Sequence, residues 1–165
     1  MRLKVCRLRP DAPPTGELVG AIERMAVTRQ ARVADALCVA RTTEGELAAI
    51  DLPVARAGAG IVDLLDFRLA PDRRRKLTAR TLTQRPDGVA PATVRAIGET
   101  LGPGTAVVAF LVTGTSPLLD AAVARCGGWM VADVPTTARA LAGLDAVLLK
   151  VVATSPRHAR RGAEQ

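Results

Sequence analysis

The sequence predicts an α+β fold, because segments typical of strands and of helices follow one another along a single chain. The clearest evidence lies in the segment Gly104 to Val134. It begins with Thr105–Val112, an apolar run of strand length, and continues with a helix whose N-cap and first position suit Ser116-Pro117. Gly127-Gly128 end this helix, and Trp129–Val134 is a further strand. A strand, a crossover helix and a second strand are the components of α/β and α+β domains.

A strand and a helix are predicted at the beginning of the chain. Apolar and polar residues alternate over part of Leu3–Leu8, and this strand ends before Pro13-Pro14. Thr15 then caps a helix in which apolar residues recur at helical spacing, among them Leu18, Ile22 and Met25. We expect this helix to end near residues 27–30.

The segments Arg32–Arg41 and Leu47–Leu52 are predicted to form a β-hairpin. The five residues between them are polar and include Gly45, which suits a turn position with positive φ. Pro53 ends the second strand. This hairpin argues against a Rossmann-type alternation, which is the competing interpretation, because it would interrupt the parallel strand order.

The segment 54–89 is predicted to be an Arg-rich, flexible connection within the domain. An apolar, helix-like cluster over Ile61–Leu69 precedes the charge run Asp72–Lys76. The threonines that follow, Thr78, Thr81 and Thr83, are typical of a loop. A long polar connection inside a compact domain is either functional or mobile.

Three further segments complete the predicted organisation. A helix begins at Pro91 and extends to Leu101, and a last helix spans Ala138–Val152. The polar segment Ser155–Gln165 is predicted to be a disordered basic tail. Residues 1–154 therefore form one domain, with the connection 54–89 inside it.

The first six core elements follow the order βαββαβ, which matches the ferredoxin-like split pattern. In that arrangement the first two helices, near 15–28 and 91–101, cover one face of an antiparallel sheet. The strand Trp129–Val134 extends the sheet, and the C-terminal helix lies against its end or against a partner.

Several segments resemble a family of short, mostly actinobacterial proteins known only as a domain of unknown function. The resemblance rests on Gly16-Glu17-Leu18, the hairpin from Arg32 to Leu52, the turn and strand Leu101–Val112, and the helix end Cys126-Gly-Gly-Trp129. It covers most of residues 3–149 and implies this topology without an activity, a ligand or a catalytic residue. Some relatives are labelled membrane proteins for an apolar insert. Its place here is taken by Ala57–Leu65, which is too short and too charged to span a bilayer. The relatives are acidic, whereas this chain is basic.

Composition sets limits on the class of protein. The chain has 165 residues, 48% of them hydrophobic and only 2% aromatic, so its core must consist of small aliphatic side chains. The net charge is +7. This charge indicates either an anionic partner or simply the Arg-rich composition of a GC-rich genome, since it is spread along most of the chain. Three separate cysteines favour buried thiols in a reducing cytoplasm, and neither a signal peptide nor a transmembrane span is predicted.

No catalytic or metal site is predicted. His158 is the only histidine and lies in the tail, so neither a Ser-His-acid triad nor a metal centre can be assembled around it, and no cofactor motif is present. Thr115 and Ser116 precede a helix N-terminus and are candidates for binding phosphate. An ordinary capped turn is the alternative interpretation.

The sharpest functional candidate is the group of basic residues at Arg73, Arg74, Arg75, Lys76 and Arg80. Together with the arginines of the tail they would bind phosphates. The alternative is a solvated loop. An RNA-binding domain of the RRM type is disfavoured, because the first and third strands lack the aromatic residues that stack on bases.

The sequence thus leaves three functions open. The first is a non-enzymatic, cytoplasmic domain that acts through protein association, as a homo-oligomer or with a protein partner. The second is an anion-binding module for nucleic acid or acidic lipid. The third is a small-molecule sensor with a pocket beside Gly114–Ser116.

Overall fold

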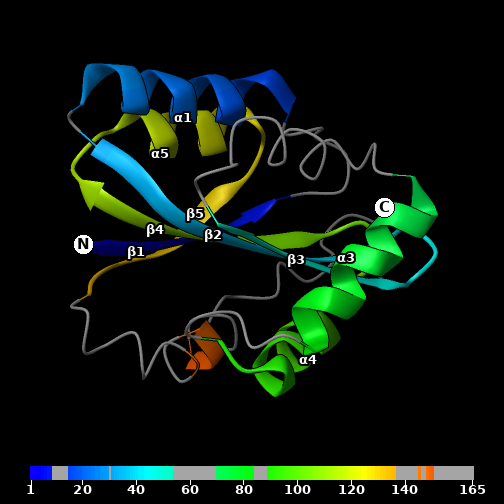
Figure 1. Cartoon of the computed structure of the whole chain (residues 1–165). Helices are drawn as coiled ribbons and strands as arrows, with labels where there is room; N and C mark the ends of the chain where they lie inside the picture. The colour runs from blue at the N-terminus through cyan, green and yellow to red at the C-terminus, as the bar shows by residue number, and fades with distance from the viewer. Residues whose placement is uncertain are drawn as a thin grey trace, which may run out of the picture.

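In the described part of the chain five strands form one antiparallel sheet, and helices pack on both of its faces (Figure 1). The computed structural model describes residues 1–8, 15–29, 31–53, 70–83, 89–136, 145 and 148–150. The elements are β1 (Arg2–Leu8), α1 (Thr15–Thr28), β2 (Ala31–Arg41), β3 (Leu47–Pro53), α3 (Pro71–Thr83), α4 (Pro91–Glu99), β4 (Ala106–Gly114), α5 (Leu118–Arg125) and β5 (Trp129–Pro135). The predicted α+β class is confirmed.

The strand order β3-β2-β4-β1-β5 interleaves two crossover units. In the first unit α1 connects β1 to β2, and β4 lies between these two strands. In the second unit α5 connects β4 to β5, and β1 lies between them. Since all four neighbouring pairs are antiparallel, each unit joins two parallel strands through one intervening strand.

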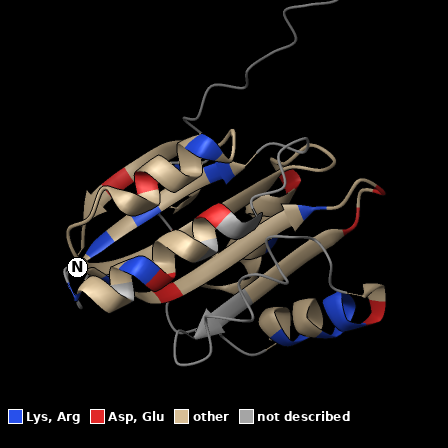
Figure 2. Ribbon diagram, turned by 90° about the horizontal axis from the view of Figure 1, so that it is seen from above, with Lys and Arg blue, Asp and Glu red and all other residues tan. Residues whose placement is uncertain are grey.

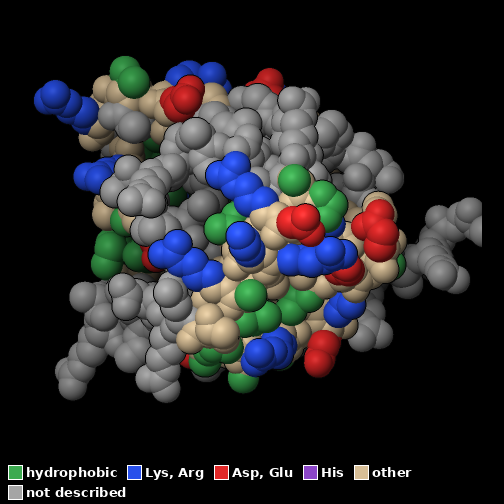
Figure 3. All heavy atoms as spheres, turned by 45° about the vertical axis from the view of Figure 1, so that its right-hand side comes forward, with side chains coloured by type: hydrophobic (Ala, Val, Ile, Leu, Met, Phe, Trp, Pro, Cys, Tyr) green, Lys and Arg blue, Asp and Glu red, His purple; other side chains and the backbone are tan. Residues whose placement is uncertain are grey.

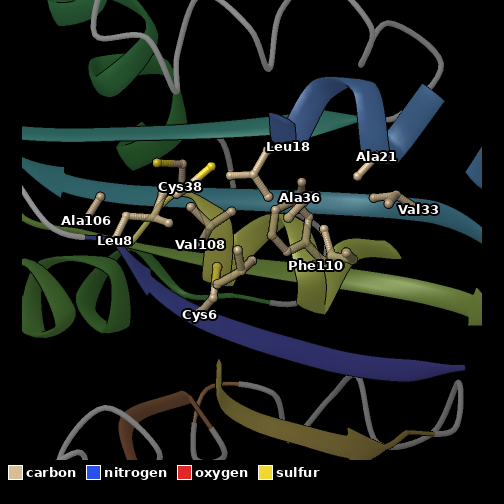
Figure 4. Close-up of a cluster of buried hydrophobic side chains, with 14 of the residues drawn as sticks. Cys6, Leu8, Leu18, Ala21, Val33, Ala36, Cys38, Ala106, Val108 and Phe110 are labelled. Atoms are coloured by element: carbon tan, nitrogen blue, oxygen red, sulfur yellow. The ribbon is translucent and has the colours of Figure 1, made fainter. Parts of the chain in front are cut away.

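Side chains that alternate along the strands fill two separate cores. In β1, Cys6 and Leu8 face the first core, whereas Leu3 and Val5 face the second. Figure 4 shows part of the first core, where Leu18 of α1 packs near Phe110 and Val108 of β4. Among the described residues of this core Phe110 is the one large aromatic side chain, and the rest are Ala, Val, Leu, Ile, Cys and Met, as the composition requires.

The helices divide between the two faces differently from the prediction. α1 and α5 lie side by side over the first core (Figure 1), whereas Val94 and Ile97 of α4 are buried in the second. The expectation that the helices near 15–28 and 91–101 share one face is therefore wrong. Because α5 occupies the space beside α1, α4 buries its apolar side on the face that these helices leave open.

Local signals for turns and helix ends are largely confirmed. Gly45 has a φ of 87° in the β2–β3 turn, where its N–H donates to the carbonyl of Thr42 at 2.9 Å. α5 begins one residue later than predicted, at Leu118, and Pro117 occupies the N-cap position. Gly127 has a φ of 67° and ends that helix.

The threonines predicted to lie in a loop are helical. Thr78 and Thr81 are buried on α3, and the hydroxyl of Thr78 donates to the carbonyl of Arg74 at 2.9 Å. Such bonds to the preceding turn allow threonine to remain in a helix that packs well. The remainder of the predicted connection, 54–69 and 84–88, lies outside the described residues.

The end of the chain is described only in part. Asp145 and Leu148–Lys150 are helical, within the helix predicted over 138–152, and Leu148 is buried in the second core. Asp145 accepts a hydrogen bond from the backbone N–H of Ala90 at 2.8 Å. The other residues of that helix and the predicted disordered tail, 155–165, lie outside the described residues.

Candidate anion-binding surface

The helix α3 covers the outer edge of β3 and so holds the basic residues in place. Leu77 of α3 packs against the first core and Leu82 against the second, which places the helix across the edge of the sheet. The hydroxyl oxygen of Thr78 accepts a hydrogen bond from the backbone N–H of Ala49 in β3 at 3.1 Å. This bond satisfies an edge donor that is buried away from water.

Arg74 and Arg75 of α3 are engaged by an acidic residue. Glu46 accepts a hydrogen bond from Arg75 at 3.0 Å, and its second carboxylate oxygen lies 3.8 Å from the guanidinium of Arg74. The hydrogen bond with Glu46 raises the pKa of Arg75, and Asp72 lies 3.6 Å away on the same helix. These two arginines therefore fix the beginning of α3 against the β2–β3 turn.

An outward basic stripe is formed by the other candidate residues, Arg73, Lys76 and Arg80. Their spacing of three and four residues places them on one side of the helix, and all three are exposed. Buried Thr78 and Thr81 mark the opposite side. Figure 3 looks toward the side of the molecule where α3 lies and shows several Lys and Arg side chains close together, with Asp and Glu side chains among them.

Two predicted site residues, Thr115 and Ser116, do not join this surface. They follow β4 at the end that pairs with Ala31, whereas Glu46 and Arg75 lie beyond the opposite end of β2. Ser116 is buried, and its hydroxyl accepts the N–H of Leu118 at 3.3 Å, which is the ordinary role of such a residue at a helix start. The helix that follows packs against α1 and β5.

An ionic cluster around the buried Lys4, which the sequence analysis did not identify, lies on the first-core side of β1. The ammonium nitrogen of Lys4 lies 2.8 and 3.0 Å from the carboxylate oxygens of Asp120 and 2.8 Å from Asp133. Arg2 also binds Asp133, at 2.6 Å. The available signal was that Lys4 shares the face of its strand with Cys6 and Leu8, so its side chain had to point inward.

Burial opposes the charge on Lys4 and would lower its pKa, but the hydrogen bonds and charges of Asp120 and Asp133 outweigh it and raise that pKa. Burial would likewise raise the pKa of Asp133, yet the bonds from Lys4 and Arg2 lower it. The cluster is internally neutralised and ties β1 to α5 and β5. A lysine held protonated in this way is not a nucleophile, so the cluster is structural.

Arg7 is a second basic residue of β1 whose side chain is not fully exposed to solvent. It is half-buried opposite Trp129 of β5, and its buried Nε has no hydrogen-bond partner. Burial lowers the pKa of this guanidinium. A buried N–H group without a hydrogen-bond partner destabilises the fold.

The remaining chemistry of the described residues is sparse. No three of their His, Cys, Asp and Glu side chains lie close enough together to bind a metal ion. Cys6, Cys38 and Cys126 are buried free thiols, and burial raises the pKa of Cys38 to about 12. Among the helices of this part of the chain, none has the length and apolar character needed to span a bilayer.

Comparisons of the chain with protein-family models, curated proteins and solved structures found no match. The resemblance to the actinobacterial family therefore stays a prediction. The candidate surface has to be assessed from its own geometry, and that geometry separates the outward basic stripe from the arginines that anchor the helix.

Proposed function

We propose that this protein binds the phosphate backbone of nucleic acid, without catalysis, through the outward basic stripe on α3. The observation that carries the proposal is that Arg73, Lys76 and Arg80 share one exposed side of a helix fixed to the sheet edge. Five basic residues and one acidic residue lie within its 13 positions. Positive side chains held in register attract phosphates and release their counterions.

A nucleic-acid backbone fits this surface better than a lipid membrane does. A helix that lies in a membrane interface buries an apolar side among the lipids. In α3 the two leucines, Leu77 and Leu82, are already packed into the protein cores. The outward side offers charge without an apolar anchor, which suits a polyanion in solution.

The expected binding is electrostatic and insensitive to base sequence. The strands of the described sheet present one aromatic residue besides buried Phe110, namely Trp129 on β5, far along the sheet from α3. The described strands therefore provide no aromatic residue beside the outward basic stripe on which a base could stack. Affinity in the non-specific range, with Kd of about 10⁻⁴–10⁻⁶ M at physiological salt, is expected.

The other hypothesis, association with proteins through apolar helix faces, receives less support. The exposed large apolar side chains of the described residues are Met1, Val27 and Leu149, which lie on separate elements. Basic positions, in contrast, occur on several strands and helices (Figure 2), and α3 carries four of them in succession, Arg73–Lys76.

A filter-binding titration with labelled duplex DNA at low salt tests the proposal. The stripe variant Arg73→Ala, Lys76→Ala, Arg80→Ala should bind at least tenfold more weakly than the native protein, since each lost phosphate contact weakens binding. The matched control, Arg24→Ala, Arg32→Ala, Arg95→Ala, removes the same charge from exposed sites elsewhere and should bind almost as the native protein does. An equal loss of DNA affinity in both variants would indicate an effect of net charge alone. Tighter binding to anionic vesicles than to DNA would indicate that the stripe binds a membrane instead.

We also propose a ferredoxin-like core, assigned differently from the sequence prediction. Its elements would be β1, α1, β2, β4, α5 and β5, and β3, α3 and α4 would be an insertion between its two halves. The strand order β2-β4-β1-β5, with α1 and α5 on one face, supports this assignment. A cytoplasmic location is likewise proposed, supported by three buried free thiols.

A further inference from the structure

Arg75 lies on α3 beside the outward basic stripe, and its guanidinium contacts the β2–β3 turn. Its side chain is 61% exposed, so a phosphate in solution can reach it. The same guanidinium donates a hydrogen bond to a carboxylate oxygen of Glu46 at 3.0 Å. Arg74, which lies 3.8 Å from the other carboxylate oxygen, is only 16% exposed. Of the two arginines beside Glu46, Arg75 is therefore the one that is accessible to a phosphate.

The backbone of Glu46 is held in place by the β2–β3 turn. Its carbonyl accepts the N–H of Thr42 at 2.9 Å, and its own N–H donates to the hydroxyl of Thr42 at 3.0 Å. Thr42 is buried, and the guanidinium of Arg41 donates to the carbonyl of Gly45 in the same turn at 2.8 Å. Since the backbone is already ordered, pairing with Arg75 costs only the freedom of the two side chains.

Asp72 is a second acidic residue near Arg75, but it binds this arginine less closely. Its carboxylate oxygen lies 3.6 Å from the guanidinium, which is too far for a hydrogen bond. Its side chain is 97% exposed, so water and salt screen the pair. The hydrogen bond with Glu46, in contrast, is the largest of the causes that raise the pKa of Arg75. Glu46 is therefore the main local counter-charge of Arg75.

We propose that Glu46 limits the number of phosphates that this surface binds, because it withholds Arg75 from the nucleic acid. A phosphate that approaches Arg75 meets the negative charge of Glu46 and competes with a hydrogen bond that is already made. The native surface then binds phosphates through the outward basic stripe, and Arg75 becomes a further contact only when the charge of Glu46 is removed. This inference rests on the proposed function of the stripe.

Duplex DNA binding at several salt concentrations tests the proposal. Glu46→Gln keeps a carbonyl oxygen that can accept the hydrogen bond of Arg75 but removes the charge. The slope of log K against log salt should steepen by about 0.9, which corresponds to one further phosphate contact, and the affinity at about 50 mM salt should rise about tenfold. The control Glu44→Gln removes the same charge from the same turn, at a side chain that accepts a hydrogen bond from Thr43 at 2.7 Å, and should keep the native slope.

Variants of Arg75 show whether the gain in affinity passes through this arginine. Arg75→Gln alone should keep the native slope, because Arg75 does not contact a phosphate while Glu46 is charged. Added to Glu46→Gln, the same substitution should abolish the gain and restore the native slope. The proposal would be overturned if Glu46→Gln gave no steeper a slope than Glu44→Gln, if its gain survived the loss of Arg75, or if Arg75→Gln alone lowered the slope.

NMR of the native protein gives a second measurement that does not depend on the folding of Glu46→Gln. The Nε–Hε resonances of Arg73 and Arg80 should shift when duplex DNA is added, whereas that of Arg75 should stay in place. A shift of Arg75 as large as that of Arg73 would contradict this inference and leave the proposed function intact. If neither Arg73 nor Arg80 shifted and the stripe variant kept the native slope, the proposed function itself would be wrong, and this inference with it.

Discussion

Replacement of Lys4 by methionine should destabilise the protein by about 2–3 kcal/mol at neutral pH. The side chain of Lys4 is 6% exposed, and its ammonium nitrogen lies within 3.0 Å of three carboxylate oxygens. Methionine retains the length of the buried aliphatic stem but removes the ammonium group from both carboxylates, so that Asp120 loses this partner and Asp133 keeps Arg2.

The magnitude follows from how far those carboxylates reach solvent. Loss of one partner from a fully buried ion pair costs about 3–5 kcal/mol, whereas an exposed pair contributes less than about 1 kcal/mol. Asp120 is 46% exposed and Asp133 is 33% exposed, so both recover part of their hydration in the variant. The expected loss therefore lies between these limits.

The loss should depend on pH. The pKa of Asp133 is lowered, because the hydrogen bonds from Lys4 and Arg2 outweigh burial. Its contribution to stability is present above the ordinary aspartate value of 3.8 and is lost as the pH falls through the lower folded value. The pKa of Lys4 is raised above 10.5, so its contribution is complete at neutral pH and disappears only as the pH rises through that higher value.

Urea unfolding followed by the fluorescence of Trp129, the only tryptophan, measures this difference on the strand beside the cluster. The control Arg24→Met, at an exposed helix position, should change stability by less than about 0.5 kcal/mol. The reasoning would be refuted if Lys4→Met changed the free energy of unfolding by less than about 0.5 kcal/mol at neutral pH. It would also be refuted if the loss of stability were just as large in acid, below the folded pKa of Asp133.

Three other substitutions test the packing, each by urea unfolding against the native protein. Arg7→Met should stabilise the fold by about 1–2 kcal/mol, since it removes a desolvated guanidinium with an unpaired Nε; a loss of stability would contradict this. Gly128→Ala should cost at least about 2 kcal/mol, because a Cβ there would lie 2.6 Å from the carbonyl oxygen of Arg7, and a neutral result would show that the backbones are farther apart. Thr78→Val should cost about 1–2 kcal/mol through the lost acceptor for the N–H of Ala49, and unchanged stability would argue against α3 as the cover of that edge.

The elements that local chemistry specifies were predictable from the sequence. The hairpin around Gly45 and the strand–helix–strand segment ending in β5 carry their own turn, breaker and periodicity signals. The face on which α4 packs was not predictable in this way. It depends on the position of β4 between β2 and β1, and no feature of residues 91–99 encodes that strand order.

The candidate site likewise has one part that the sequence predicts and another that depends on contacts between distant segments. The sequence identified the basic residues, but the three threonines, which have low helix propensity, masked the helical propensity of the arginines, the lysine and the leucines around them. The helix is stabilised by Leu77, Leu82 and the bond between Thr78 and Ala49, which are contacts between distant segments. Only these contacts distinguish the outward basic stripe from the arginines held by Glu46.

The salt dependence of duplex DNA binding tests the proposed function of α3 most directly. If the three residues of the outward basic stripe each contact a phosphate, their removal should reduce the slope of log K against log salt by about 2.7, at about 0.9 per contact. The control variant lacking Arg24, Arg32 and Arg95 should retain the native slope. A stripe variant that binds with the native slope would show that α3 does not contact the phosphates.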